Sequence, residues 1–262
     1  MAKSANSYSV INTATCAISW AHNLAGLESP IKHILVSEIC NGLKRKLARP
    51  SQPKEPFERK HIHQLFKSMQ SSQLTDVRNT LIIVLAYFAF LRVDELRHMR
   101  ATHIRITDDH AEITIPKSKC DQLRQGNTVL VARLVGSYCP VALLELYLKS
   151  ASLDIAVIEK KEVYIFRRLK ISNKSLSLSE KDMPMSYSSI REVVKRKATQ
   201  LGLDAKFFGT HSMRIGGATT AANSLIPDRL FQKHGRWASA SSKDRYIKDS
   251  VQQRLNISQA LG

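Results

Sequence analysis

Hydrophobic positions along this chain recur mostly every three or four residues, which is the spacing of a helix. Such spacing between Ile11 and Leu47 predicts two or three helices. The longest apolar run, LIIVLAYFAFL from Leu81 to Leu91, has eleven residues and predicts a buried helix, because a membrane span needs about 20. Shorter helices are expected from Val93 to Met99 and from Pro140 to Ser150. The pattern therefore predicts a mainly α-helical protein.

Three short segments have the composition of strands instead. They run from His103 to Ile106, from Glu112 to Ile115 and from Thr128 to Val131. Asp108-Asp109 supplies a turn between the first two. These segments predict a small three-stranded antiparallel sheet within the helical fold, while the polar, serine-rich residues 167–185 are expected to form a surface loop.

A proline-rich segment divides the chain into a small and a large part. Residues 46–60, KLARPSQPKEPFERK, hold three of the eight prolines and five basic side chains, and proline at this density stops helices. We expect a small helical region over residues 1–48, a linker over residues 49–58 and a larger domain over residues 59–262.

The charge changes the picture from a generic helical protein to one with a polyanionic partner. Lysine and arginine number 40 against 22 acidic residues, which gives a net charge of +18 and a pI near 10. A basic surface of this size binds a phosphate backbone by releasing counterions. The N-terminus lacks the apolar core of a secretory signal, so an intracellular protein is expected. Four scattered cysteines without a CxxC pair predict reduced, mostly buried thiols: Cys16, Cys40, Cys120 and Cys139.

One predicted helix carries a strongly basic face. Ser189 followed by Glu192 resembles a capping box for the helix SIREVVKRKATQLGL. The face opposite its apolar stripe is either solvated or in contact with phosphates, and the sequence favours the two interpretations about equally. The candidate phosphate contacts are Arg191, Lys195, Arg196 and Lys197 in this helix, with Lys44 and Arg45 in the N-terminal region.

The segment GTHSMRIGGATTA holds the first candidate for chemistry. His211 and Arg214 lie three residues apart on a predicted helix and therefore on one side of it, close enough to share an anion. Taken alone, they are more often an ordinary surface pair. Gly216-Gly217 argues against that alternative, because glycine inside a helix costs about 1 kcal/mol relative to alanine and suggests a close backbone approach.

Two further segments offer cationic candidates. In FLRVDELRHM, Arg92 directly follows the apolar helix, and Glu95 is placed three residues later to hold it. Lys117 and Lys119 enter a polar turn between two predicted strands. A hairpin lysine is usually solvated, but its flexible ammonium can also reach a neighbouring groove and deliver a proton.

The last candidates lie in HGRWASASSKDRYIKDS. Trp237 and Tyr246 are nine residues apart, and both would be core residues by default. Tyr246, however, stands among charged residues, which is unusual for a buried ring. His234 is a competing candidate beside Trp237, and its alternatives are a helix-end contact or a phosphate contact.

Taken in order, these motifs resemble those of the tyrosine recombinases, the phage-integrase-like enzymes that share a catalytic fold with type IB topoisomerases. The resemblance covers roughly residues 57–255. LRVDEL is similar to the first arginine box of the family, HSMR to the second, and GRW with a tyrosine nine residues later to the third, with Trp237 where many members have histidine. Residues 1–48 look like the C-terminal part of the family's helical core-binding domain. The SKCDQ and HGRW contexts look closest to recombinases of eukaryotic DIRS-like or crypton-like mobile elements.

The resemblance implies a role for each candidate in cleaving and rejoining DNA. Tyr246 would be the nucleophile, forming a 3′-phosphotyrosine link, and His211 its general base. Preorganised donors on the phosphate oxygens are worth roughly 3 to 4 kcal/mol each, which suits arginine and the indole N–H. Lys119 would be the general acid for the departing 5′-oxygen, with Lys117 as the alternative. The implied catalytic set is Arg92, Lys119, His211, Arg214, Trp237 and Tyr246, supported by Glu95.

The resemblance also implies partners: double-stranded DNA, and other copies of the chain in a tetramer on paired sites. No metal or other cofactor is implied. The segment from Ile247 to Leu261 has an apolar side that either docks on a neighbouring subunit or packs on its own domain: Val251, Leu255, Ile257 and Leu261.

Two rival functions remain at this level, a type IB topoisomerase and a domesticated DNA-binding protein without catalysis. The favoured function is site-specific recombination that integrates or excises a mobile element. The expected location is the nucleus for a eukaryotic element and otherwise the cytoplasmic nucleoid.

Overall fold

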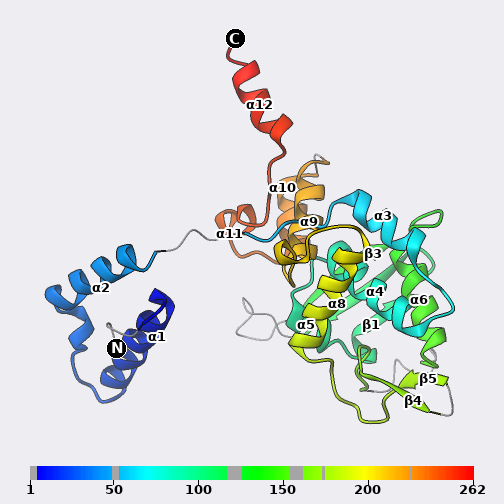
Figure 1. Cartoon of the computed structure of the whole chain (residues 1–262), viewed down its shortest axis with the longest axis horizontal. Coiled ribbons are helices and arrows are strands. Elements are labelled where there is room, and N and C mark those ends of the chain that lie inside the picture. Colours follow the sequence, from blue (N-terminus) through cyan, green and yellow to red (C-terminus); the bar gives the residue numbers. More distant parts are fainter. Residues whose placement is uncertain (1–4, 49–52, 117–125, 154–161, 173–174, 225) are drawn as a thin grey trace. The chain divides into compact units, whose positions relative to one another are not determined.

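The computed structural model describes residues 5–48, 53–116, 126–153, 162–172, 175–224 and 226–262. The chain forms two compact units, Met1–Gln52 and Pro53–Gly262, called here the N-terminal and the C-terminal unit (Figure 1). In the described residues, no helix has both the length and the apolar character that crossing a membrane requires.

The N-terminal unit is a helical pair, as the apolar spacing predicted. It consists of α1 (Tyr8–Leu24), a short 3-10 turn (Pro30–Lys32) and α2 (Ile34–Lys46). Ser7 caps α1 by accepting from the Ser9 amide at 3.1 Å. Most of its large apolar side chains are exposed, including Trp20 and Leu35, each 66% accessible. The unit therefore has little core of its own.

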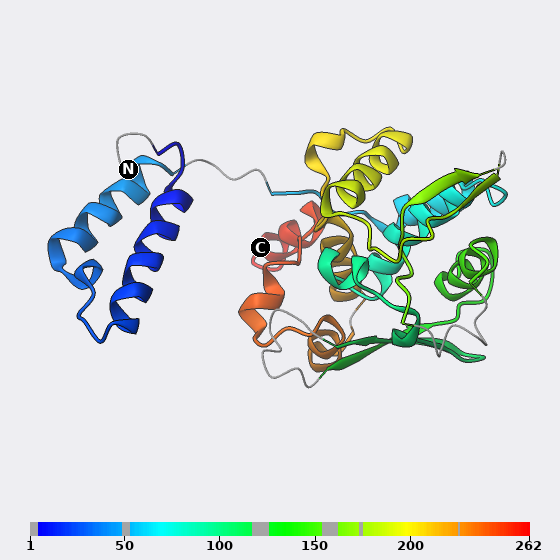
Figure 2. The same cartoon turned by 90° about the horizontal axis from the view of Figure 1, so that it is seen from below.

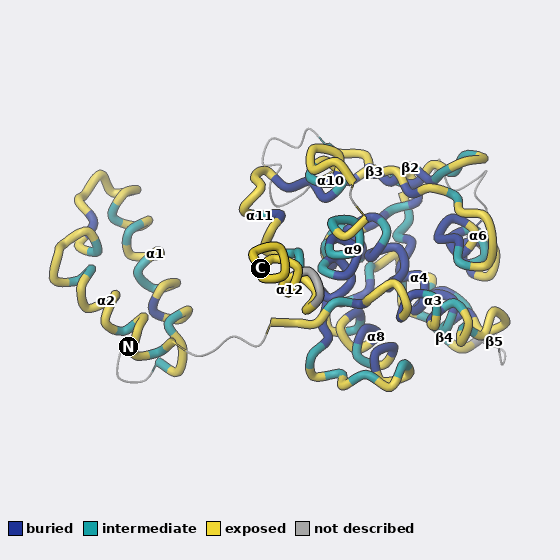
Figure 3. Tube along the Cα trace, turned by 90° about the horizontal axis from the view of Figure 1, so that it is seen from above, coloured by how far each residue is buried: buried dark blue, intermediate teal, exposed yellow. Residues whose placement is uncertain are grey.

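The C-terminal unit is built around α4 (Leu74–Phe88), the helix predicted from the apolar run. Its central residues, Leu81 to Leu85, are at most 1% exposed, and the helix appears as a buried centre in Figure 3. It packs against α3, α6, α8 and α9. The other helices among the described residues of this unit are α3 (Arg59–Ser68), α5 (Val93–Arg97), α6 (Pro140–Ser150), α8 (Tyr187–Gln200), α9 (Ser212–Ala222), α10 (Asp228–Gly235), α11 (Ala240–Asp244) and α12 (Val251–Gln259).

The predicted sheet is confirmed. Strands β1 (Ile104–Ile106), β2 (His110–Ile115) and β3 (Asn127–Ala132) pair antiparallel in the order β1-β2-β3 (Figure 2). Ile113 lies opposite both Ile104 and Val129, and all three side chains are buried. Alternate residues on one face thus join the core, so the fold is mainly α with one small three-stranded sheet.

Two expectations about local structure are wrong. The serine-rich segment contains a hairpin, β4 (Leu169–Ser172) with β5 (Ser175–Leu178), because alternating apolar residues such as buried Leu178 can turn inward despite the polar composition. Helix α8 begins at Tyr187, and its cap is Ser186, whose side chain accepts from the Ser189 amide at 3.1 Å. The predicted capping box at Ser189 therefore lies one turn too late.

The C-terminal unit starts earlier than the expected boundary at residue 59. Phe57 is fully buried, and its amide donates to the Ser212 carbonyl at 3.1 Å. The Glu55 amide donates to the Phe207 carbonyl at 2.8 Å. Residues 53–58 are thus bound to the large unit, and residues 49–52 of the expected linker lie outside the described residues.

The cysteines differ in exposure from what the sequence predicted. Cys139 is buried, Cys40 is partly exposed and Cys16 is exposed, and all three are free thiols. Cys120 lies outside the described residues. Among the three described cysteines, the expectation of a buried thiol is therefore correct only for Cys139.

Candidate active site

Arg214 lies at the centre of the candidate site, in the first turn of α9. Its side chain is fully buried, and its two terminal nitrogens donate to the carbonyls of Phe90 and Gly235. His211 lies directly before the helix, at the N-cap position, and not within it as predicted. One short segment thus places an imidazole and a guanidinium side by side, where α9 meets the end of α4 and the end of α10.

Two aromatic rings cover the Arg214 guanidinium. Its Cζ lies 4.6 Å from the centre of the Trp237 ring and 5.0 Å from that of Tyr246. The two rings contact each other with centroids 5.5 Å apart, and His211 lies 6.4 Å from Tyr246 on the same measure. The structure therefore brings together His211, Arg214, Trp237 and Tyr246, which the sequence spreads over 36 positions.

Two donors in this cluster lack a hydrogen-bond partner among the described residues. They are Nε of Arg214 and Nε1 of Trp237, and both atoms are buried. Buried polar groups are nearly always hydrogen-bonded in folded proteins, so each exception calls for an explanation. An anion bound at the cluster would supply an acceptor for such donors.

Arg92 is held at the start of α5 by the carboxylate that the sequence placed three residues later. Its Nη1 donates to Glu95 Oε1 at 2.8 Å, and its backbone amide donates to Glu95 Oε2 at 2.8 Å. The Arg92 side chain is 16% exposed and that of Glu95 is 4% exposed. The guanidinium thus has a fixed place while part of it still reaches the surface.

Arg92 and His211 line a cavity of about 600 Å³ that also includes Ile115 and Pro116 at the end of β2. Lys117 and Lys119, the predicted general acids, lie outside the described residues.

The surroundings of His211 make it suitable as a base, although the residue is exposed to solvent. Its pKa is lowered from the usual value of 6.5, chiefly by partial desolvation of the ring and further by the charges of Arg214 and Arg92. The imidazole is therefore neutral at pH 7 and can accept a proton. Burial, with the charges of Arg92 and Arg236, also lowers the pKa of Arg214, but guanidinium starts so high that it stays protonated at neutral pH.

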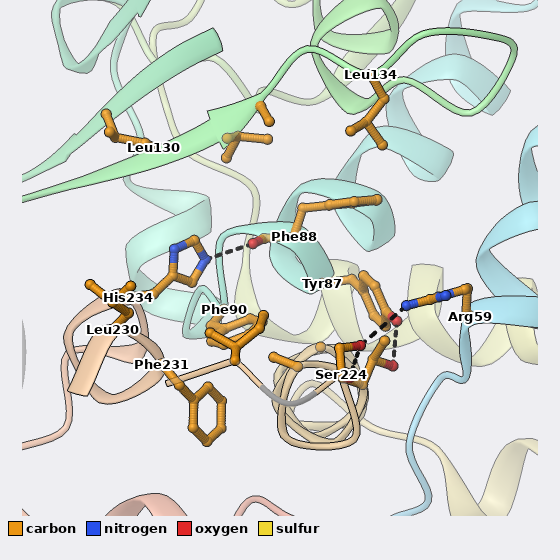
Figure 4. A pocket seen from close by; sticks show the side chains of 16 residues that line it. Arg59, Tyr87, Phe88, Phe90, Leu130, Leu134, Ser224, Leu230, Phe231 and His234 are labelled. Carbon is orange, nitrogen blue, oxygen red and sulfur yellow. Dashed lines mark hydrogen bonds between the residues drawn. The ribbon is translucent and has the colours of Figure 1, made fainter. Parts of the chain in front are cut away.

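His234 takes a structural place instead of joining the cluster. Its Nε2 lies 2.8 Å from the Phe88 carbonyl, and its ring packs edge-on against Phe90 with centroids 4.7 Å apart. It lines a mostly apolar cavity of about 390 Å³ (Figure 4), which also includes Tyr87 and Leu130. Of the two alternatives for His234, the structure shows the helix-end contact.

The basic face of α8 is partly as predicted. Arg191 and Arg196 are exposed and Lys195 is partly exposed. Lys197 is not on this face: it is 3% exposed, and its ammonium lies 2.6 Å from Asp76 Oδ1 on α4. Its expected contact with phosphate is wrong because it neutralises a carboxylate inside the unit. In the N-terminal unit, Lys44 and Arg45 are exposed on α2.

One buried cation of the site, Arg236, is not among the candidates that the sequence pattern indicates. It lies between Gly235 and Trp237, and its Nη2 is 2.6 Å from Glu95 Oε2. Its backbone is left-handed, with φ 55° and ψ 42°. The available signal was its position directly beside Trp237, but an arginine in so basic a chain attracts no notice. In the described part of the chain, no three histidine, cysteine, aspartate or glutamate side chains gather as a metal site would require.

Comparison with known proteins identifies the fold around this site. The Phage integrase family matches residues 56–253, which include every described residue of the cluster. The chain belongs to this family. It is therefore a tyrosine recombinase. The chain is 25% identical over 244 residues to an integrase/recombinase xerD homolog from Selenomonas ruminantium, and the match covers 91% of this chain and 67% of that protein.

Solved structures of recombinases share the fold at lower identity. XerA recombinase superposes with a TM-score of 0.56 at 16% identity, over 94% of this chain and 74% of that one. The structure of XerH bound to its difH substrate superposes with a TM-score of 0.55 at 17% sequence identity. The match covers 78% of this chain and 53% of the XerH chain. The structure of a lambda integrase dimer bound to a COC′ core site superposes with a TM-score of 0.54 at 16% sequence identity. The match covers 90% of this chain and 58% of that chain. The chain thus spans about half the length of the XerH chain that it matches.

Proposed function

We propose that this chain is a site-specific DNA recombinase that cleaves and rejoins strands through a 3′-phosphotyrosine link to Tyr246. The observation that carries the proposal is the stacking of Tyr246 and Trp237 on the buried Arg214 guanidinium, with His211 alongside. Membership of the Phage integrase family supports it, as does the order of the motifs along the chain.

In the proposed reaction, the Tyr246 oxygen attacks a phosphodiester and the bond to the 5′-oxygen breaks. His211 takes the phenolic proton, and Lys119, or else Lys117, gives a proton to the departing oxygen. Arg92, Arg214 and the Trp237 indole N–H hold the phosphate oxygens, each preorganised donor contributing roughly 3 to 4 kcal/mol to the transition state. The partnerless Nε of Arg214 and Nε1 of Trp237 support this part.

The proposed partner is double-stranded DNA. The net charge of +18 supports it, and the structures of XerH and lambda integrase named above are complexes with DNA. Arg191, Lys195 and Arg196 on α8 would contact phosphates. In the N-terminal unit, residues 1–48 are proposed as a partial core-binding region with Lys44 and Arg45 toward the DNA backbone.

We also propose that the chain assembles as a tetramer on paired sites through its C-terminal segment. The apolar residues of this segment are 47% to 84% exposed: Val251, Leu255, Ile257 and Leu261. They do not bury themselves on their own unit, which was the alternative, so docking on a neighbouring subunit is favoured. We propose the apolar cavity of Figure 4 as the receptor on the neighbouring subunit, because its lining matches these side chains in chemistry.

A role in moving a mobile element, by integration or excision, remains a proposal at the same level. The relatives named above do not bear on the DIRS-like or crypton-like origin, which stays a prediction. A eukaryotic element would place the protein in the nucleus, and otherwise it would act in the nucleoid.

A covalent adduct with DNA tests the function directly. Wild type is incubated with nicked suicide duplexes that carry candidate target sites selected by binding, and the mixture is analysed on a denaturing gel. We expect a protein–DNA adduct from wild type and none from Tyr246→Phe. Tyr138→Phe is the matched control, because that ring stacks on His63 and not in the cluster. An adduct that persists in Tyr246→Phe, or wild type without adduct on a bound target, contradicts the proposal.

A further inference from the structure

Arg236 joins the two parts of the site that hold Arg92 and Arg214. Its Nη2 donates to Glu95 Oε2 at 2.6 Å and to the Phe90 carbonyl at 3.1 Å. Its Nη1 donates to the Ala89 carbonyl at 3.2 Å. Glu95 is the carboxylate that binds Arg92, and the Phe90 carbonyl is also an acceptor for Arg214. One guanidinium therefore contacts both acceptors on which the two arginines depend.

Both side chains of the contact between Arg236 and Glu95 are buried. The Arg236 side chain is 3% exposed and that of Glu95 is 4% exposed. A planar guanidinium can reach two acceptors at fixed angles, whereas a lysine ammonium acts as a single flexible point charge. At a site excluded from solvent, an ion pair fixes the relative position of its two side chains. Removing one partner leaves the other charge buried and uncompensated.

The backbone of Arg236 and of its contact residue Phe90 is also unusual. In the part of the chain that the structure describes, three non-glycine residues have positive φ, and two of them meet here: Phe90 at 47° and Arg236 at 55°. Left-handed backbone is unfavourable for side chains other than glycine and persists only where surrounding contacts enforce it. A glycine at position 236 would adopt this backbone freely, so the arginine is there for its side chain.

We propose that Arg236 is a positioning residue that fixes Arg92 through Glu95 and Arg214 through the Phe90 carbonyl. The proposal rests on the proposed function for what the two arginines do. Arg236 itself does not touch DNA, since its guanidinium is covered. It acts on the rate of strand cleavage and not on the affinity for DNA.

The first test separates rate from affinity in the full chain. In Arg236→Met, we expect the single-turnover cleavage rate at saturating DNA to fall about 10- to 100-fold, the size of effect that a misplaced catalytic group produces. The Kd for the same duplex should stay within about twofold, because phosphate contacts on the surface supply affinity. Arg236→Lys should recover part of the rate.

Two further variants separate positioning from mere destabilisation. Arg78→Met is the matched control, since Arg78 is also a buried arginine that donates to a carbonyl, that of Arg167, at 3.0 Å. It lies ten residues before the end of α4, about 15 Å along the helix axis. It should lower Tm while leaving the cleavage rate of the folded protein unchanged. Arg236→Gly removes the backbone strain as well as the side chain, and it should cleave as slowly as Arg236→Met.

A second measurement needs no DNA. In the free protein with isotope-labelled arginine, NMR reports rotation of the Arg92 guanidinium, which should be slow in wild type and in Arg78→Met and fast in Arg236→Met. Wild-type cleavage by Arg236→Gly, an equal loss of rate in Arg78→Met, or an unchanged Arg92 signal would each overturn the proposal. If wild type forms no covalent adduct, the proposed function fails, and the NMR comparison alone still decides whether Arg236 positions Arg92.

Discussion

His211 carries the clearest pH dependence at the scale of single residues. Its pKa in the folded protein lies below 6.5, because partial desolvation and two guanidinium groups oppose its protonation. At pH values between the folded pKa and 6.5, His211 binds more protons in the unfolded chain than in the folded one. The free energy of unfolding therefore falls as the pH falls through this range. Above 6.5 the imidazole is neutral in both states, so the titration of His211 no longer lowers the free energy of unfolding. The neutral base is therefore present across the neutral range.

We expect the strand-cleavage rate to be level above pH 6.5 and to fall below it as His211 takes up a proton. His211→Gln should lower the plateau rate by about 10²-fold or more and remove this acid limb. The measurement is single-turnover cleavage as a function of pH. His61→Gln is the control: burial also lowers the pKa of His61, at the start of α3, but this residue lies outside the cluster. A His211→Gln profile that matches wild type contradicts the role of base.

Residue-level prediction succeeded where spacing in the sequence carries the information. Glu95 contacts Arg92 because the N-cap residue and the third residue of a helix, three positions apart, lie on the same side of the helix start. The contact of Tyr246 with Arg214 could not be derived from spacing, because it depends on how α10 and α11 fold back on α9; the family resemblance supplied it. Lys197 was misplaced because its partner, Asp76, is 121 positions away and no local pattern reveals it.

At the scale of elements, the two glycines of α9 allow the helix to touch its neighbours. A Cβ on Gly216 would lie 2.0 Å from the Phe57 carbonyl oxygen, and one on Gly217 would lie 2.1 Å from that of Tyr87. The close backbone approach expected from Gly216-Gly217 is therefore made with this chain's own backbone. It brings α9 against the end of α4 and the segment before α3.

Gly216→Ala should lower the free energy of unfolding of the C-terminal unit by about 1 to 3 kcal/mol, the usual cost of overpacking. Gly42→Ala is the matched control inside a helix, because an added Cβ there meets no atom within 4 Å. It should stabilise α2 by up to about 1 kcal/mol through helix propensity. Urea unfolding of both variants measures the difference. Equal stability of Gly216→Ala and wild type would refute the close contact.

The helices and strands differ in how well their sequences predict them. Helix α4 was found because an unbroken apolar run has few ways to be buried other than as a core helix or strand, and its length decided for a helix. The β4–β5 hairpin was missed because serine at alternate positions lowers the mean hydropathy of SLSL below that of a typical strand. The start of the C-terminal unit was placed too late, since nothing local shows that Phe57 is buried.

At the scale of the whole molecule, the exposed side chains of α12 predict dependence on a second copy. Leu255→Asp with Ile257→Asp should leave binding to a single site intact while abolishing the pairing of two duplexes. The readout is the mass of the protein–DNA complex in solution. Ile171→Asp, an exposed apolar residue on β4 at 79%, is the control and should assemble normally. Unchanged assembly in the double variant contradicts the role of α12.

The chain enters the C-terminal unit along a route with a mechanical consequence. The backbone hydrogen bond from Phe57 to Ser212 attaches the entering segment, residues 53–58, two residues before Arg214, and Gly216 packs against the backbone of the same phenylalanine. A pull on the chain before residue 53 would pass along the backbone into this segment. The pull therefore meets first the hydrogen bond from the Glu55 amide to the Phe207 carbonyl, and then the bond from Phe57 to Ser212 in the opening turn of the helix that carries the central arginine.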